Sequence, residues 1–398
     1  MSLPKQKTRS SSYNRSVNLP LAILGVITLG VIGSIVFLLL PMLIGAFTEI
    51  LSLSTTQVGL LGSADMTGMF IAALVATGWI RTCNWRVIAA LACGLLIACH
   101  ILSGFVQSFV PLYLIRVLAG FAGGSLMSIA LTSLGDTRQP DRFFALFIAG
   151  QLTLGGLGLW LFPGFLAQFG LRGVFSALAV VVLCASLFIL FIPQQGRKIE
   201  PTPISPSRDR AKNHSLLPGL MALLACFIFN LGIMAVWAYL ERMGNAAGLE
   251  ASFIGSTLAM SLFGALCGAL LAAVMADRFG RVIPLIITVV VQIIALLLLG
   301  GEITKNSFLA GVMLFAFTWN FPVPFQLAIT VTMDISGRLV VLFLSAVKLG
   351  YAAAPVIVAQ LIMTGSGFTP VIVLAAAGFV TSALIYVALT RLKPPVRG

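Results

Sequence analysis

Four ionisable side chains lie deep inside long apolar stretches of the chain. They are Asp65, Arg116, Lys348 and His100. A charge in a hydrocarbon environment is costly unless it is paired or hydrated, so each of these residues is a candidate for a functional role. Asp65 and Arg116 form a protonatable pair of residue types, whereas a buried cation favours an anionic ligand. For His100 we expect a packing role instead.

The elements that carry these residues must be membrane helices. Of the 398 residues, 59% are hydrophobic and 9% are charged, and the mean hydropathy is +1.09. A soluble protein carries about 25% charged residues, so this chain lacks the charges to cover a soluble surface. At about 20 residues per bilayer crossing, the apolar stretches predict twelve spans, near 20–46, 57–80, 87–108, 110–133, 143–168, 173–193, 217–240, 253–276, 282–300, 307–332, 339–363 and 368–391. We therefore expect an all-α integral membrane protein.

The basic residues predict the orientation of these spans. Most of the 24 Lys and Arg fall in the two tails and in alternate loops, and only Arg172, Arg242 and Lys305 fall on the other side. This asymmetry places both termini in the cytoplasm. The net charge of +13 is thus a topology signal and does not indicate a nucleic-acid partner. We expect a multi-pass protein of the plasma membrane, as in a bacterial inner membrane.

The chain divides into two similar halves. The stretch 194–216 is the one long hydrophilic connection, and it follows the sixth span. Loop landmarks recur about 195 residues apart; Arg142 and Arg338 are one such pair. The predicted organisation is a cytoplasmic tail (1–19), a six-helix bundle (20–193), a linker (194–216), a second six-helix bundle (217–391) and a cytoplasmic tail (392–398). An even number of spans per half makes the repeats parallel, with a binding site expected between them.

Two motifs resemble a known family. The loop 273–281 reads AVMADRFGR and resembles the signature GxLADRxGR of the major facilitator superfamily. The fourth span carries Arg116, Gly120 and Gly124, similar to that family's RxxxGxxxG pattern. The resemblance implies a twelve-span transporter, and it implies a conformational latch formed by Asp277, Arg278, Gly280 and Arg281. In the first half, Thr82 stands where the acidic residue of this loop is expected.

The resemblance also implies partners for the buried charges. It associates the fourth-span arginine, here Arg116, with proton transfer or substrate contact. It places the second and eleventh spans side by side, and Asp65 and Lys348 lie at similar depths, counting about 1.5 Å per residue. We expect a salt bridge between Asp65 and Lys348, with a purely structural partner for Asp65 as the alternative.

Spans 1, 4, 7 and 10 line the central cavity in this family. The segment 318–326 in the tenth span reads TWNFPVPFQ, and its two prolines predict a broken helix. The candidate substrate-binding residues are Lys348, Asn230, Trp319, Asn320, Phe325 and Gln326. A simple kink, with polar groups that only satisfy the backbone, is the alternative. Trp237 and Tyr239 are interpreted as anchors at the membrane interface.

The function that we expect is secondary active transport of a small organic solute, as proton-coupled efflux of an amphipathic compound by an antiporter. Import or facilitated movement of a small organic anion is the alternative. No Lys follows a Gly, so the phosphate-binding P-loop is missing and no cofactor is expected. The six cysteines form no CxxC pair, and no metal site or catalytic constellation is expected. The expected partners are the bilayer, the solute and the proton, and the chain is expected to work as a monomer.

Overall fold

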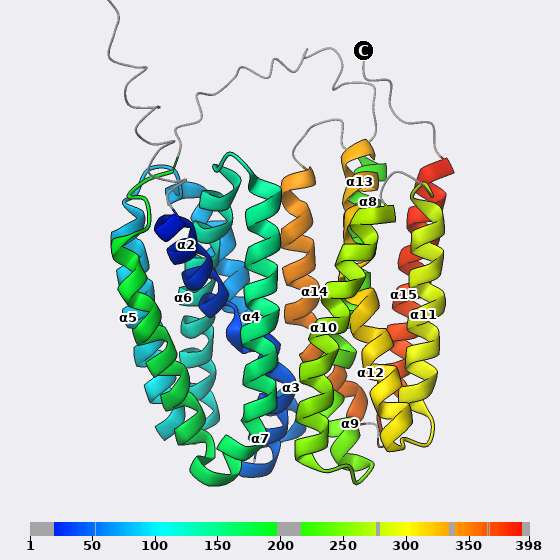
Figure 1. The fold of residues 1–398 in the computed structure, drawn as a ribbon. Coiled ribbons are helices and arrows are strands. Elements are labelled where there is room, and N and C mark those ends of the chain that lie inside the picture. Colours follow the sequence, from blue (N-terminus) through cyan, green and yellow to red (C-terminus); the bar gives the residue numbers. More distant parts are fainter. Residues whose placement is uncertain are drawn as a thin grey trace, which may run out of the picture. The chain divides into compact units, whose positions relative to one another are not determined.

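The computed structural model describes residues 20–51, 53–196, 216–275, 279–333, 339–363, 365 and 367–391, without the side chains of residues 141 and 339–341. Both predicted tails and most of the predicted linker lie outside these residues. The described part of the chain is helical and contains no strand, as the apolar stretches predict. Figure 1 shows the helices in sequence colours.

The helices have the following bounds: α2 (Pro20–Gly33), α3 (Ile35–Ile50), α4 (Thr55–Trp79), α5 (Trp85–Phe105), α6 (Phe109–Gly135), α7 (Pro140–Ser186), α8 (Leu217–Trp237), α9 (Leu240–Ala246), α10 (Ala251–Met275), α11 (Val282–Gly300), α12 (Lys305–Asn320), α13 (Val323–Met333), α14 (Leu339–Ile362) and α15 (Thr369–Arg391), with a short 3₁₀ turn at Leu187–Leu190. Among the described residues, eleven helical segments are long and apolar enough to cross a membrane. The predicted count is twelve.

The difference in count comes from α7. This element has 47 residues, and a straight helix of that length would measure about 70 Å, more than twice the bilayer core. Its backbone is not helical at Gly170, where φ is 62° and ψ is −169°. Glycine adopts a positive φ without a Cβ clash, and the chain turns back there (Figure 1). The two arms of α7 correspond to the predicted spans 143–168 and 173–193.

The chain forms two compact units. Among the described residues, unit 1 comprises those from Pro20 to Leu39, Ala64–Leu157 and those from Gly164 to Gly196, and unit 2 comprises Leu40–Ser63, Gly158–Pro163 and those from Leu216 onwards. The end of α3 and the start of α4 therefore group with the second half of the sequence.

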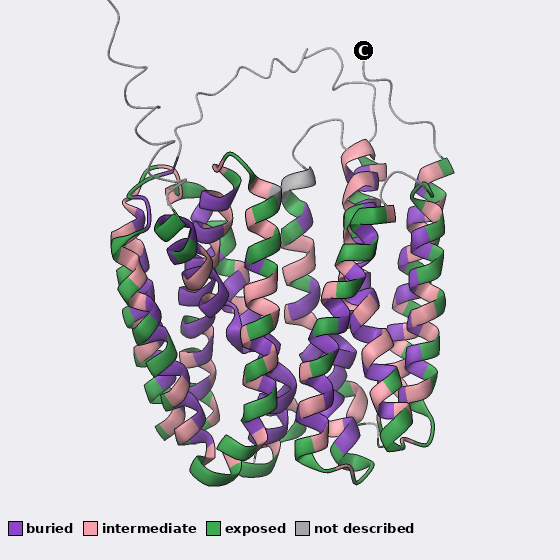
Figure 2. Ribbon diagram, viewed as in Figure 1, coloured by how far each residue is buried: buried purple, intermediate pink, exposed green. Residues whose placement is uncertain are grey.

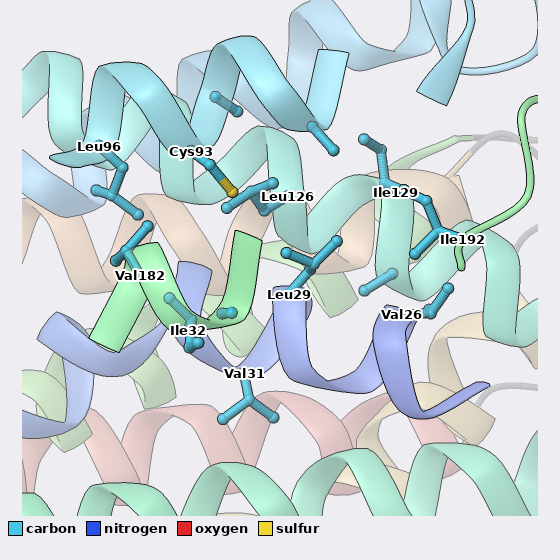
Figure 3. Close-up of a cluster of buried hydrophobic side chains, with 14 of the residues drawn as sticks. Val26, Leu29, Val31, Ile32, Cys93, Leu96, Leu126, Ile129, Val182 and Ile192 are labelled. Atoms are coloured by element: carbon cyan, nitrogen blue, oxygen red, sulfur yellow. The ribbon is translucent and has the colours of Figure 1, made fainter. Parts of the chain in front are cut away.

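Unit 1 is held together by apolar side chains from four helices. Figure 3 shows Leu29 and Ile32 of α2 among Cys93 of α5, Leu126 of α6 and Val182 of α7, all buried. At the other end of this cluster, Ile192, which follows the 3₁₀ turn, lies beside Val26 of α2.

In unit 2, α8 packs along α14 and α15, and α12 lies between α10 and α11. Its core includes Phe321, Phe325 and Tyr386.

The outward faces of these helices are apolar as well. Leu91 on α5 is 66% exposed and Leu297 on α11 is 70% exposed. In Figure 2, both helices have one buried and one exposed side. Such a surface suits a hydrocarbon solvent, in which the side that faces away from the protein must also be apolar.

Candidate functional site

The first candidate site lies where α4 and α6 approach each other closely. A Cβ on Gly120 of α6 would overlap with the backbone of Asp65 on α4. A Cβ on Gly68 of α4 would in turn overlap with the backbone of α6 at Val117. Small residues at a helix contact allow backbones to approach in this way. Because Arg116 lies one turn before Gly120, this approach brings its side chain against Asp65.

Arg116 and Asp65 form a two-pronged ion pair. Nε of Arg116 donates to Oδ2 of Asp65 at 3.0 Å, and Nη2 donates to Oδ1. Arg116 is 1% exposed and Asp65 is 6% exposed. Parallel bonds of this kind between a guanidinium and a carboxylate are among the strongest side-chain hydrogen bonds. The charges of the two groups therefore compensate each other inside the unit.

The remaining sides of the guanidinium contact α5 and α7. Nη1 of Arg116 lies 3.3 Å from Nδ1 of His100 and 3.5 Å from Oγ of Ser103. The ring of Phe175 lies 5.2 Å from the guanidinium carbon and stacks against His100. A guanidinium can only donate, so Nδ1 of His100 is the acceptor and the ring proton lies on Nε2. That nitrogen is buried and has no hydrogen-bond partner among the described residues.

Asp65 is the acidic side chain of this cluster, and His100 is its other titratable member. Arginine stays protonated in proteins, and the carboxylate of Asp65 is the negative partner that holds its guanidinium. A proton on Asp65 would replace the ion pair by a weaker bond between a cation and a neutral acid, and the contacts of Arg116 to His100 and Ser103 would remain.

The structure thus corrects two expectations. Asp65 bonds through both oxygens to Arg116, whereas similar depth had indicated Lys348 as its partner. Depth fixes only one coordinate, and the glycine contact between α4 and α6 decides the pairing. His100 was expected only to pack, but it bonds to Arg116 and completes the cluster.

A second cluster forms in unit 2 around Trp319 of α12. Its Nε1 donates to the hydroxyl of Tyr351 on α14 at 2.9 Å, and the two rings meet edge to face. The ring of Trp237 on α8 packs against Trp319 with centroids 5.1 Å apart. The ammonium of Lys348 lies 5.9 Å from the centre of the Tyr351 ring. The cluster combines aromatic faces with one cation, which suits a flat ligand with a negative charge.

The other candidate residues of unit 2 have different surroundings. Asn230 is buried and donates to the carbonyl of Cys226 on its own helix at 2.8 Å. Asn320 ends α12 and is half-buried. Phe325 lies in the apolar core of the unit, and Oε1 of Gln326 is buried without a partner in the described residues. Only Trp319 and Lys348 of the candidate set therefore belong to the aromatic cluster.

The expected break in the tenth span is present, because α12 ends at Asn320 and α13 begins at Val323. The interfacial role of Trp237 and Tyr239 was wrong, since both side chains are buried. The hydroxyl of Tyr239 donates to the carbonyl of Pro355 on α14 at 3.0 Å. The polar residues that follow them suggested a surface, but the helix face that carries both rings points into the unit.

Two of the expected latch residues, Asp277 and Arg278, lie outside the described residues. Gly280 has a φ of 64°, a conformation that favours glycine. Nη1 of Arg281 donates to Oγ1 of Thr332 at 2.5 Å and to the carbonyl of Ala328 at 3.1 Å, so it ties this loop to α13.

The corresponding loop of unit 1 has an ion pair of its own. Nη1 of Arg81 lies 2.5 Å from Oδ2 of Asp136 at the end of α6. Thr82, at the place of the missing acid, bonds to the carbonyl of Trp79 in its own turn. Arg86 donates to the carbonyl of Ile192 at 2.8 Å. Asp136, at the end of α6, is therefore the acidic partner of Arg81 in this loop.

Sequence reasoning missed Tyr351, Ser103 and Phe175. Tyr351 follows Lys348 by three residues, a spacing that puts both on one helix face, so this signal was available. Ser103 and Phe175 carry no comparable signal, because serine and phenylalanine are common in membrane helices.

Comparisons with known proteins agree with this architecture. Residues 22–250, more than half of the chain, match the model of the Major Facilitator Superfamily. No curated protein matches the chain. A variant of the nucleoside transporter NupG has a TM-score of 0.76 at 13% identity, with 93% of this chain and 100% of that chain covered.

Two further solved structures show the same fold. The D-xylose-proton symporter has a TM-score of 0.72 at 16% identity, over 94% of this chain and 97% of its own. A bacterial homologue of the human lysosomal transporter Spinster, inward-facing and occupied, has a TM-score of 0.62 at 15% identity, over 98% of each chain. With the motifs at Arg116 and Gly280 and the match over residues 22–250, the chain belongs to the major facilitator superfamily and is a secondary transporter, not an enzyme.

Proposed function

We propose that this protein couples the movement of protons to that of a small organic solute by alternating access. The observation that carries the proposal is the buried pair of Asp65 and Arg116. A buried pair contributes little net stability compared with apolar residues of the same size, so its presence supports a role in transport. Protonation of Asp65 weakens its bond to Arg116, and this change links proton binding to a change of helix contacts.

The solute that fits best is amphipathic, with a flat apolar part and a negative charge. The rings of Trp319 and Tyr351 supply the apolar face, and Lys348 supplies the positive charge. Asn230, Asn320, Phe325 and Gln326 remain candidates for further contacts.

Efflux driven by proton entry is the direction that we propose. Import of an organic anion is the second candidate, and Lys348 beside Tyr351 favours it. Among the solved structures, one is a nucleoside transporter and one a D-xylose-proton symporter, so the fold serves solute–proton symport as well.

The test is untargeted mass spectrometry of cells and medium. Strains express the native protein, the Asp65→Asn variant or neither. We expect a compound that moves outward only with the native protein. Depletion of a compound from the medium would reverse the direction, and equal movement with Asp65→Asn would remove the role of Asp65 in coupling.

A matched control separates a specific effect from a general loss of negative charge. Glu250 is an exposed carboxylate in the connection before α10, and Glu250→Gln removes the same charge as Asp65→Asn. We expect native transport from this variant. Once a compound is identified, proteoliposomes with an entrapped pH dye measure the accompanying proton flux, which Asp65→Asn abolishes.

A further inference from the structure

Two segments that are far apart in the sequence meet in unit 2 through two successive contacts. A Cβ on Gly45 of α3 would overlap with the carboxyl group of Glu241 on α9. Nδ2 of Asn245 on α9 donates to Oε1 of Glu49 on α3 at 2.5 Å. Four residues separate the contacts on each helix, so both lie on one face. We call the residues Gly45, Glu49, Glu241 and Asn245 the α3–α9 contact.

Glu241 is unusual in this contact because it is nearly enclosed. It is 7% exposed, and its Oε2 accepts no hydrogen bond from any described residue. Glu49 lies one turn beyond Gly45 on α3, and Arg242 follows Glu241 on α9. A buried carboxylate is costly when one of its oxygens accepts no hydrogen bond, whereas the neutral acid is less costly. Burial and the unbonded Oε2 therefore make the neutral form of Glu241 less costly than the ionised form.

The neighbouring helices add few charges to this contact. A Cβ on Gly244 would contact Ile254 of α10 and Phe308 of α12 at 2.9–3.1 Å, so α9 packs on both. The connections before α10 and α12 carry Glu250 and Glu302, and α12 begins at Lys305, whose ammonium lies 5.8 Å from the ring centre of Phe253.

Further contacts at this end of unit 2 are uncharged and tight. A Cβ on Gly59 of α4 would lie 2.7 Å from the carbonyl of Pro355 on α14, and one on Gly62 would lie 3.2 Å from Cβ of Pro355. Tyr239, which bonds to the same carbonyl, is the titratable side chain in this group. These contacts pack α4 against α14. The titratable carboxyl groups of the α3–α9 contact are those of Glu49 and Glu241.

We propose that Glu241 and Glu49 together bind one proton, and that this proton closes the α3–α9 contact. When the proton leaves, two carboxylates repel each other across the contact and the end of α3 separates from α9. The charge distribution of the loops predicts that this end faces outside, so closing takes up a proton from the outer side. This site is distinct from Asp65 and Arg116, and it does not depend on the identity of the solute.

The test measures the separation of the two segments directly. Spin labels are placed at Ile50→Cys and Ala247→Cys, both exposed positions at the ends of α3 and α9. The accessible native cysteines Cys83, Cys184 and Cys267 are replaced by Ser. Distance distributions are recorded in lipid nanodiscs between about pH 5 and pH 9. For one linked proton, the ratio of separated to close pairs rises with pH, by up to about tenfold per pH unit.

Three variants show which carboxyl groups cause the pH dependence of this ratio. Glu241→Gln has the shape of the neutral acid and should stay in the close state at every pH. Glu49→Gln removes the repelling charge and should flatten the dependence, which gives a second measurement if Glu241→Gln folds poorly. Glu250→Gln, the matched carboxylate before α10, should keep the native slope.

Three results would overturn the proposal. The first is a ratio of separated to close pairs that does not change with pH in the native protein. The second is a pH dependence of this ratio that persists in Glu241→Gln. The third is a ratio that changes when choline replaces sodium at constant pH. Asp65→Asn is measured in the same background. A slope that is lost in Asp65→Asn but kept in Glu241→Gln would contradict this proposal and leave the proposed function intact.

Discussion

At the scale of single residues, the ion pair of unit 1 illustrates why buried charged groups occur together with partners that satisfy all of them. Arg116 bonds to Asp65 and His100, and Phe175 covers the guanidinium. A substitution that removes one of these side chains leaves a polar group of its partner buried without that hydrogen bond. The changes in unfolding free energy of such substitutions must therefore be coupled.

This coupling gives a prediction for stability. Asp65→Asn and Arg116→Gln should each lower the free energy of unfolding by about 3 kcal/mol, because each leaves one buried charge without its partner. The double variant should lose clearly less than the sum, since it buries no unpaired charge. Thermal unfolding in detergent measures all three. Arg81→Gln, which breaks the more exposed pair with Asp136, should cost less than about 1 kcal/mol. Additive losses at Asp65 and Arg116 would contradict the coupling.

Lys348 gives a prediction for transport. If its ammonium binds the negative charge of the solute, Lys348→Gln should raise the KM by about tenfold or more, the value of one charge-assisted hydrogen bond. The maximal rate should change less. The matched variant Tyr351→Phe keeps the ring beside Lys348 and removes the hydroxyl that accepts the bond from Trp319, so its KM should stay closer to native. Uptake of the identified solute into proteoliposomes provides both constants, and an unchanged KM in Lys348→Gln would exclude an anion contact.

At the scale of helices, the approach of α4 to α6 depends on glycine. Gly120→Ala would place a methyl group within the backbone of α4 at Asp65, so the helices must separate. We expect a loss of at least about 2 kcal/mol in stability and a transport rate near that of Asp65→Asn, because the ion pair is stretched. Thermal unfolding and transport are measured on the same preparation.

Gly94 of α5 is the matched control for this prediction. A Cβ on Gly94 would meet nothing within 4 Å. Gly94→Ala should leave transport unchanged and raise stability slightly, because alanine is the better helix former by about 1 kcal/mol. If both alanine variants behaved alike, the close approach at Gly120 would not be what holds Asp65 against Arg116.

The positions of the helices could be predicted from the sequence, but the contacts between them could not. Hydropathy predicted where the membrane helices lie, because a bilayer span requires a long apolar stretch. It did not predict which residues share a helix contact, since that depends on rotation about each helix axis. Arg116 and its two glycines were found from their spacing, and Asp65 was grouped with Arg116 as a protonatable pair. The direct bond between them was not predicted, because it depends on the close approach of Gly120 to the backbone of Asp65. Trp237 was misplaced for the same reason.

At the scale of the whole molecule, the central question is how often the chain crosses the bilayer. Eleven apolar helical segments are present among the described residues, and one of them, α7, reverses at Gly170. If both arms of α7 span the membrane, the chain crosses twelve times and the two halves of the sequence have the same orientation. A single crossing by α7 would invert every later helix relative to the predicted orientation.

Three glutamines around α7 can decide between these arrangements. Gln139 precedes α7, Gln168 lies just before the reversal, and Gln195 follows the second arm; all three are exposed. Each is replaced by Cys, one at a time, in the background without Cys83, Cys184 and Cys267. With two crossings, an impermeant maleimide should label Gln168→Cys in intact cells, and Gln139→Cys and Gln195→Cys only after lysis. Labelling of Gln195→Cys from outside would show that α7 crosses once, and both the parallel halves and the outer position of the α3–α9 contact would then be wrong.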